Sequence, residues 1–334
     1  MKRAASEDQL LSWLRGRIPE EATDPLLGDD AALLPRGGPW AVTVDSQIAG
    51  IHFDPDLDPA VVARRLLAVN LSDIAATGAR PAYAFLALSA TPGFDHRRFF
   101  SALLADCRRH AVRLAGGDLA RQPAATTATL TLLGTLPPGG HRLRRSAAAA
   151  GDELWLGGTV GESAAGRRLI DSGARLRGSK VELPEGLSQS SVALRAAARR
   201  AVRRHLLPVP QLELGRWLGR QRRAAAIDVS DGLSRDLSRL SRESAVGALV
   251  VAEDLPLSDH FLPLCQRIGC DPWELVLGGG EDYVLLFTLP AGRRPPAHFA
   301  CRRIGEMKAS RRLHWTLGGA RALLPDRGWD HLSK

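Results

Sequence analysis

The sequence predicts a mixed α/β fold in two domains. A length of 334 residues suggests two domains. In both halves, apolar runs typical of strands are interspersed with runs at helical spacing. Between the halves, the PPGG segment at 137–140 and the basic stretch at 141–145 are typical of a linker. We therefore expect an N-terminal domain over 1–137, a linker over 138–150 and a C-terminal domain over 151–334.

In the first half, helices and strands are expected in alternation. Residues 6–9 form a capping-box pattern, which predicts the start of a helix. Asp58-Pro59 predicts a helix that ends near Gly78, because Asp caps the first amides and Pro fits the first turn. The remaining expected elements are a strand over 40–44 that ends at Asp45, a strand over 83–88, a helix over 94–114 and a strand over 126–136.

The second half opens with a predicted strand over 154–156, followed by a glycine-rich turn at 157–161 that precedes a helix. Further helices are expected over 190–205, 211–222, 232–242 and 258–268, and further strands over 224–229, 248–252 and 282–289.

The net charge of +9 raises the question of nucleic-acid binding. Only four of the 45 basic residues are lysine, and the arginines are dispersed in pairs along the chain and not gathered in one tract. This distribution indicates a compositional bias, so we expect no nucleic-acid partner. A basic surface would still attract anionic substrates such as nucleotides.

No apolar run reaches the roughly 18 to 20 residues that span a bilayer. The N-terminus turns acidic directly after Lys2 and Arg3, unlike a secretory signal. We therefore expect a cytoplasmic protein with no membrane partner. The four cysteines form no CxxC pair, which argues against a zinc site and against a disulfide framework and favours buried free thiols.

Aspartates in turns flanked by glycine or hydroxyl residues are the most informative feature. They border apolar runs, so we expect them at the ends of strands or helices and not on an open surface. One such aspartate most often caps a turn or a helix. Several gathered carboxylates would repel one another unless cations lay between them, and Mg²⁺ with phosphate ligands suits such a site. The residues are Asp30, Asp45, Asp73, Asp118, Asp228 and Asp231.

A phosphate site in this chain must lack a P-loop lysine, because no lysine follows a glycine. It must be built from metal ions, backbone amides and arginine. Asp228 and Asp231 flank Ser230, and the helix expected from Gly232 would add N-terminal amides that favour an anion. Arg145 is a candidate phosphate clamp, with a solvated linker charge as the alternative.

Three more residues are candidates for contact with a substrate. His52 could touch a ligand or could serve in the core or as a cap. Glu281 follows three glycines, where the missing side chains let the backbone come close to another group. Trp329 could stack over a ligand or pack as a terminal aromatic.

These motifs together resemble the thiamine-monophosphate kinase family, in the superfamily of aminoimidazole ribonucleotide synthetase and selenophosphate synthetase. The matching segments run in order through nearly the whole chain. They include GDDAALL (28–34), VDSQIAGIHF (44–53), AVNLSDIAATGARP (68–81), AGGD (115–118), AIDVSDGLSRDL (226–237) and GGGEDYVLLFT (278–288).

The resemblance implies direct transfer of a phosphoryl group from ATP to thiamine monophosphate, with several Mg²⁺ ions. It does not decide whether the enzyme also requires K⁺. It also implies a homodimer in which the N-terminal α/β domain forms a β-barrel at the interface. Carried over by motif, the metal ligands are Asp30, Thr43, Val44, Asp45, Asp73, Asp118, Asp228 and Asp231, with Val44 acting through its carbonyl because the family's hydroxyl is missing there. The ATP contacts are Gly117, Asp118, Arg145 and Ser230, and the substrate contacts are His52, Glu281 and Trp329.

The chain departs from the family at 116–120, which reads GGDLA where the family often has GGDTT. No aromatic residue precedes this motif, so the residue that holds the adenine is not identified. A sister ATP-dependent enzyme acting on another small phosphate or amide remains an alternative, as does a basic nucleic-acid-binding protein. The first cysteine, Cys107, comes too late for the early reactive cysteine of a selenophosphate synthetase.

Overall fold

A computed structural model describes residues 32–34 and 40–330 of the chain. The helix expected at the N-terminus and Asp30 lie outside the described residues. In the described part, no helix is both long enough and apolar enough to cross a membrane.

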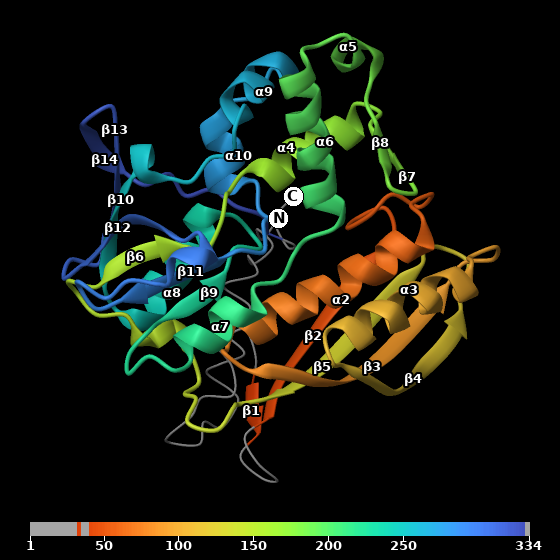
Figure 1. The fold of residues 1–334 in the computed structure, drawn as a ribbon, viewed down its shortest axis with the longest axis horizontal. Helices are drawn as coiled ribbons and strands as arrows, with labels where there is room; N and C mark the ends of the chain where they lie inside the picture. The colour runs from red at the N-terminus through yellow and green to blue at the C-terminus, as the bar shows by residue number, and fades with distance from the viewer. Residues whose placement is uncertain (1–31, 35–39, 331–334) are drawn as a thin grey trace, which may run out of the picture.

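The first half forms a five-stranded sheet in the order β1-β2-β5-β3-β4. Helices α2 (Pro59–Ala76) and α3 (His96–Arg109) cover one face of it (Figure 1). On the opposite face Val44 and Phe85 are 56% and 42% exposed. The strands are β1 (Ala32–Leu34), β2 (Trp40–Ile48), β5 (Thr127–Thr135), β3 (Arg80–Ala90) and β4 (Arg113–Arg121).

Helix α2 is buried on nearly every side, because it lies between this sheet and the second half of the chain. Its C-terminal alanines pack against Leu214 and Leu218 of α7 (Leu212–Leu218). A Cβ atom at Gly215 would lie 2.1 Å from the carbonyl oxygen of Ala75. Only glycine therefore allows α7 to approach α2 this closely.

The second half forms a seven-stranded sheet in the order β14-β13-β10-β12-β6-β11-β9. Most pairs are antiparallel, and β10 and β13 are parallel. The strands are β6 (Glu153–Leu156), β9 (Ala226–Asp228), β10 (Gly247–Val251), β11 (Leu285–Leu289), β12 (Arg302–Lys308), β13 (Leu313–Leu317) and β14 (Ala320–Leu323). A separate antiparallel pair joins β7 (Arg175–Arg177) and β8 (Lys180–Glu182).

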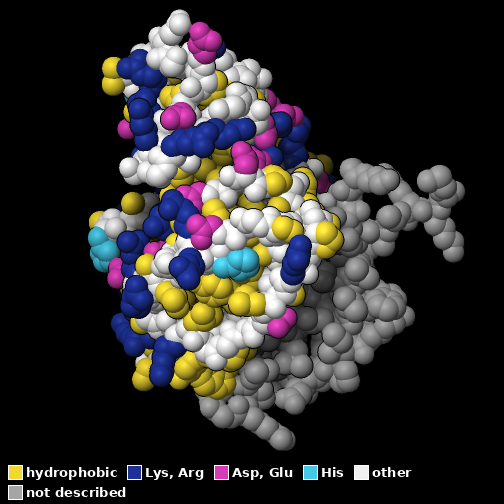
Figure 2. Space-filling model, turned by 90° about the vertical axis from the view of Figure 1, so that its right-hand side faces the viewer, with side chains coloured by type: hydrophobic (Ala, Val, Ile, Leu, Met, Phe, Trp, Pro, Cys, Tyr) yellow, Lys and Arg dark blue, Asp and Glu magenta, His cyan; other side chains and the backbone are white. Residues whose placement is uncertain are grey.

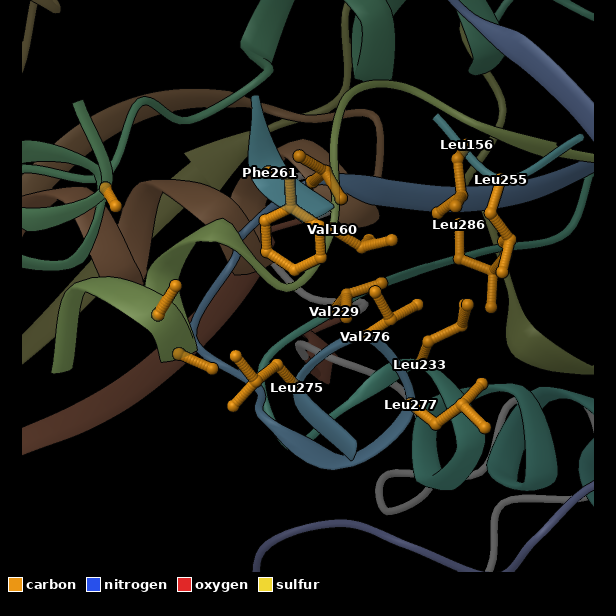
Figure 3. Packing of buried hydrophobic residues seen from close by; sticks show 14 of the residues in the cluster. Leu156, Val160, Val229, Leu233, Leu255, Phe261, Leu275, Val276, Leu277 and Leu286 are labelled. Carbon is orange, nitrogen blue, oxygen red and sulfur yellow. The ribbon is translucent and has the colours of Figure 1, made fainter. Parts of the chain in front are cut away.

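Helices pack on both faces of this second sheet. Leu285 and Phe287 of β11 contact the cluster that includes α7, whereas Leu286 between them belongs to the larger core. In that core Val229 and Leu233 point toward Val160 and Val276 (Figure 3), which anchors the turn after β9. The helices of the larger core are α4 (Glu162–Asp171), α6 (Val192–Leu206), α8 (Leu233–Ser244), α9 (Phe261–Ile268) and α10 (Pro272–Gly278).

The prediction of a mixed α/β fold is confirmed, but several details were wrong. The helix expected over 94–114 ends at Arg109, Ala111 turns the chain with φ +56°, and β4 begins at Arg113. Pairing with β3 therefore outweighs helix propensity there. Strand β2 continues to Ile48 because it pairs with β5 along its whole length. Helix α10 and strands β12 to β14 were not predicted.

The barrel implied by the resemblance is not formed by one chain. Among the described residues the first sheet is open, with β1 and β4 as its two edges. An open sheet with exposed apolar side chains on one face leaves both edges and that face available to another surface.

Candidate active site

A cavity of about 850 Å³ lies where the two halves of the chain meet, next to α2, α8 and the loop between α10 and β11. Segments that are far apart in the sequence supply its walls. Nine of the residues expected in the site line this cavity, namely Asp45, His52, Asp73, Arg145, Asp228, Ser230, Asp231, Glu281 and Trp329.

Strand β2 and helix α2 form the first acidic wall. Thr43 and Asp45 alternate with Val44 along β2, so their side chains face α2. The hydroxyl of Thr43 donates a 2.5 Å hydrogen bond to Oδ2 of Asp73 on α2. Thr43 thus orients a carboxylate of the cavity wall without lining the cavity itself.

The residue beside Asp73 on α2 reaches the second half of the chain. Ser72 is buried, and its hydroxyl donates a 2.6 Å hydrogen bond to Oδ2 of Asp228 at the end of β9. Asp73 brings its own carboxylate to the cavity, and the preceding residue, Ser72, holds the carboxylate of Asp228 from the second half of the chain there.

The turn after β9 is organised by a buried carboxylate, Asp236, one turn into α8. Its Oδ2 accepts backbone N–H bonds from Ser230, Asp231 and Gly232 at 3.1, 3.0 and 3.2 Å. Arg239 bridges this carboxylate to Asp231, with its Nη1 3.0 Å from Asp236 and 2.5 Å from Asp231. Burial and the nearby charge of Asp231 raise the pKa of Asp236 to about 7.

The glycine-rich loop at 278–281 packs directly on this turn, as the sequence predicted for a close backbone approach. The backbone N–H of Glu281 donates to the carbonyl of Ser230 at 2.6 Å. A Cβ atom at Gly280, where φ is +66°, would lie 2.5 Å from that same oxygen. The backbone N–H of Trp329 bonds Asp231 at 2.9 Å, which brings the last described segment to the cavity.

Glu281 stands in a small network of ionisable groups. Arg65 of α2 pairs with one of its oxygens, and Nδ1 of His205 on α6 lies 3.3 Å from the other. Burial raises the pKa of Glu281, but the charge and hydrogen bond of Arg65 are the main opposing influence, and that pKa lies below its ordinary value. Burial and the charge of Arg65 lower the pKa of His205 to about 3, so its ring is neutral at pH 7.

His52 follows β2 and lines the cavity together with Glu281, and its charge also helps to lower the pKa of that carboxyl. The backbone N–H of Ile48 donates to Nδ1 of His52 at 3.1 Å. In the neutral ring, the proton therefore sits on Nε2.

The sequence matches relatives of one kind over almost its full length. Residues 28–136 match the family model described as AIR synthase related protein, N-terminal domain. A thiamine-monophosphate kinase of Salmonella typhimurium is 36% identical over 320 residues, which cover 92% of this chain and 91% of that protein.

This chain belongs to the thiamine-monophosphate kinase family.

Solved structures of the family share the fold. The thiamine-monophosphate kinase of Stenotrophomonas maltophilia K279a is 34% identical, with a TM-score of 0.71 over 90% of this chain and 93% of that one. A structure described as AaThiL complexed with AMPPCP and TMP is 25% identical, with a TM-score of 0.82 over 98% of this chain and 97% of that one. The superfamily inferred from the motifs is therefore confirmed.

Besides Thr43, three residues carried over from the family motifs do not line the cavity. The side chain of Val44 points to the opposite face of the sheet. Gly117 and Asp118 lie in the middle of β4, the edge strand, and Asp118 is exposed. We had expected the aspartates to stand at the ends of elements and away from an open surface. Both expectations were wrong for Asp118, which is exposed and lies within β4. Asp45 also lies within a strand, because β2 continues past it to Ile48. Asp30 lies outside the described residues.

Basic side chains of the cavity were largely missed from the sequence. Only Arg145 was anticipated, because the others stand in helices and in the terminal segment without a distinctive motif. On the face drawn in Figure 2, the basic side chains are dispersed among acidic and hydrophobic ones. The arginines of the cavity wall are Arg145, Arg167, Arg168, Arg239, Arg242 and Arg327.

The acidic wall suits Mg²⁺ that is also held by phosphate. Asp45, Asp73, Asp228 and Asp231 supply carboxylate oxygens, the ligand type that Mg²⁺ prefers. In the described part of the chain, no group of three or more His, Cys, Asp or Glu side chains is arranged to hold an ion alone. Magnesium usually takes one or two carboxylates and completes its shell with water and substrate phosphates, so the residues fit that mode.

Proposed function

We infer that this chain transfers the γ-phosphoryl group of ATP to thiamine monophosphate, which yields thiamine diphosphate and ADP. The observation that carries this inference is one cavity with carboxylates from β2, α2 and the turn after β9, and with six arginines around them. The near full-length relationship to thiamine-monophosphate kinases and the likeness to a structure complexed with AMPPCP and TMP support the choice of substrates.

We propose that Asp45, Asp73, Asp228 and Asp231 hold Mg²⁺. When bound, the ions would neutralise phosphate charge and align the triphosphate with the acceptor. Thr43 and Ser72 keep two of these carboxylates oriented through their hydrogen bonds. The cavity arginines supply further positive charge against phosphate oxygens.

No covalent intermediate on the protein is required. A phosphate oxygen of thiamine monophosphate attacks the γ-phosphorus, the bond to the bridging oxygen breaks, and ADP leaves with that electron pair. None of the described cysteines lines the cavity. Burial raises the pKa of the Cys107 thiol to about 11 and that of Cys265 to about 12, so neither is a nucleophile at neutral pH.

We assign the thiamine moiety to His52, Glu281 and Trp329, all of which line the cavity. A carboxylate there complements the permanent positive charge of the thiazolium ring. The indole of Trp329 is about half exposed and can stack on an aromatic ring.

We propose that the active form is a homodimer joined through the open face of the first sheet. Val44 and Phe85 are exposed there, and an apolar sheet face of this kind marks an interface. Asp118 lies in register with Ala87, which is in register with Thr129, so its carboxylate shares this face. A second copy would then place Asp118 and Gly117 at the interface. We also propose that the chain divides into an N-terminal domain over 1–137, a linker over 138–150 and a C-terminal domain over 151–334.

The substrate assignment is tested by ADP release with ATP, Mg²⁺ and one acceptor at a time. We expect turnover with thiamine monophosphate and little with thiamine or with an aminoimidazole precursor. Turnover with the aminoimidazole precursor alone would favour a sister enzyme. Absence of turnover with thiamine monophosphate would refute the proposed substrate.

A further inference from the structure

Arg65 is a buried charge beneath the cavity, although it does not line the cavity itself. It stands in α2 and is 1% exposed. Its Nε donates to Oε1 of Gln47 at 3.0 Å, its Nη1 to the backbone carbonyl of His205, and its Nη2 to Oε1 of Glu281. All three guanidinium nitrogens therefore have a partner, and the partners come from three separate segments.

The carboxylate of Glu281 is held at both oxygens. Arg65 takes one, and Nδ1 of His205 lies 3.3 Å from the other. The backbone of Glu281 is held as well, with φ +56° between Gly280 and the buried Asp282. Asp282 accepts the amides of Gly161 and Ser163 at 2.7 and 3.1 Å. Glu281 therefore meets the cavity in one fixed orientation.

We propose that Arg65 is a positioning residue for thiamine monophosphate, which it serves by fixing the carboxylate of Glu281 against the cationic thiamine group. This inference rests on the proposed function and on the assignment of Glu281 to the substrate. Arginine suits the role because its planar fork reaches several acceptors at once, which the single ammonium of lysine does not do. Arg65 also bonds Gln47, two residues after Asp45, and so connects the strand of the acidic wall to Glu281.

The charge of Glu281 depends on every ionisable group that faces it. These are Arg65 from α2, His205 from α6, His52 from the segment after β2 and Tyr283 two residues on, with Arg167 of α4 acting on His205. Arg65 is the strongest influence that favours the charged form. Its removal should raise the pH at which Glu281 takes up a proton, and substrate binding should weaken at that pH.

The test compares four variants with the unsubstituted chain: Arg65→Met, Arg65→Lys, Glu281→Gln and the double variant. Initial rates give KM for thiamine monophosphate and KM for ATP from pH 4 to 8. We expect Arg65→Met to raise KM for thiamine monophosphate about tenfold or more and KM for ATP less than about twofold, since a hydrogen-bonded charge of this kind is lost. The acid limb of kcat/KM for thiamine monophosphate should move to higher pH.

Arg65→Lys should restore the position of the acid limb, because the positive charge remains, and only part of KM, because the fork is lost. The neighbouring Arg64→Met is the matched control, since Arg64 is half exposed and lies 3.9 Å from its acidic partner Asp106. It should leave both KM values and the pH profile unchanged.

Equal rises in both KM values, or an unmoved acid limb in Arg65→Met, would overturn the inference. If Arg65→Met does not fold, the double variant is compared with Glu281→Gln, because it leaves no unpartnered charge at this site. The two should have the same KM for thiamine monophosphate, and a further tenfold rise would contradict the role. Absence of turnover in the unsubstituted chain would instead overturn the proposed function, and this inference with it.

Discussion

The hydroxyl of Ser72 donates a 2.6 Å hydrogen bond to Oδ2 of Asp228, although 156 residues separate the two in the chain. The next residue, Asp73, accepts the hydroxyl of Thr43 at 2.5 Å. One turn of α2 therefore carries contacts to β2 and to β9. This turn is the structural centre of the acidic wall.

Ser72→Ala should lower the free energy of unfolding by about 1–3 kcal/mol, because the buried carboxylate of Asp228 loses a donor. Urea denaturation measures the change. Ser188→Ala is the control, since the hydroxyl of Ser188 donates to the carbonyl of Glu185 within the short helix α5 (Glu185–Ser188), where the bond is exposed to solvent. An equally small loss in both variants would mean that the bond contributes nothing.

Asp73→Asn should reduce kcat by about 10²–10³-fold while the melting temperature changes little, because the amide keeps an acceptor for Thr43 but loses the charge that binds a cation. ADP release at saturating Mg²⁺ measures the effect. Asp106→Asn on α3 provides a matched substitution away from the cavity. Near-normal turnover of Asp73→Asn would remove Asp73 from the metal site.

Gly280→Ala should destabilise the loop at 278–281 and raise KM for thiamine monophosphate, because the new Cβ would lie 2.5 Å from the carbonyl of Ser230. Gly292→Ala separates this clash from backbone strain, since Gly292 has φ +80° with no atom within 4 Å. The first variant should lose more stability than the second by over about 1 kcal/mol. Equal losses of stability in the two variants would contradict the clash and would be explained by the strain of positive φ alone.

The neutral ring of His205 should make stability depend on pH. Burial lowers its pKa to about 3, whereas an unfolded histidine titrates near 6.5. Its contribution is therefore complete above about pH 6.5 and is lost as pH falls toward about 3. Against His205→Asn, the unfolding free energy should fall by about 1.4 kcal/mol per pH unit within that window. Parallel curves for the two proteins would exclude this titration.

Phe85→Asp should dissociate the proposed homodimer, because it puts a charge on an apolar interface. Light scattering after size exclusion gives the mass. Leu262→Asp, at a similarly exposed apolar side chain on α9, should leave the mass unchanged. A monomeric unsubstituted chain that is fully active would contradict the dimer.

The sequence predicted the parts of the site that are local motifs. Asp228, Ser230 and Asp231 could be found because one turn between a strand and a helix carries them together. Asp236 could also have been found, since it follows in the same helix. Arg65 and His205 could not, because their partners are distant in the chain and only the folded structure brings them to Glu281.

The fold shows the same division. The capped start of α2 at Asp58 was predicted and is confirmed, because Asp58 accepts the N–H of Ala60 at 2.9 Å. Strand β4 was missed because its edge position, with glycines and exposed side chains, gives no alternating pattern. Strand β14 was missed because it has only four residues, all of them exposed.

The most direct test of the acidic wall is a crystal structure with Mn²⁺ in place of Mg²⁺, a nonhydrolysable ATP analogue and thiamine monophosphate. Anomalous scattering locates the ions. We expect peaks at coordination distance from Asp73 and Asp228, with the γ-phosphate between the ions and the substrate phosphate. Ions and nucleotide bound only outside this cavity would contradict the account.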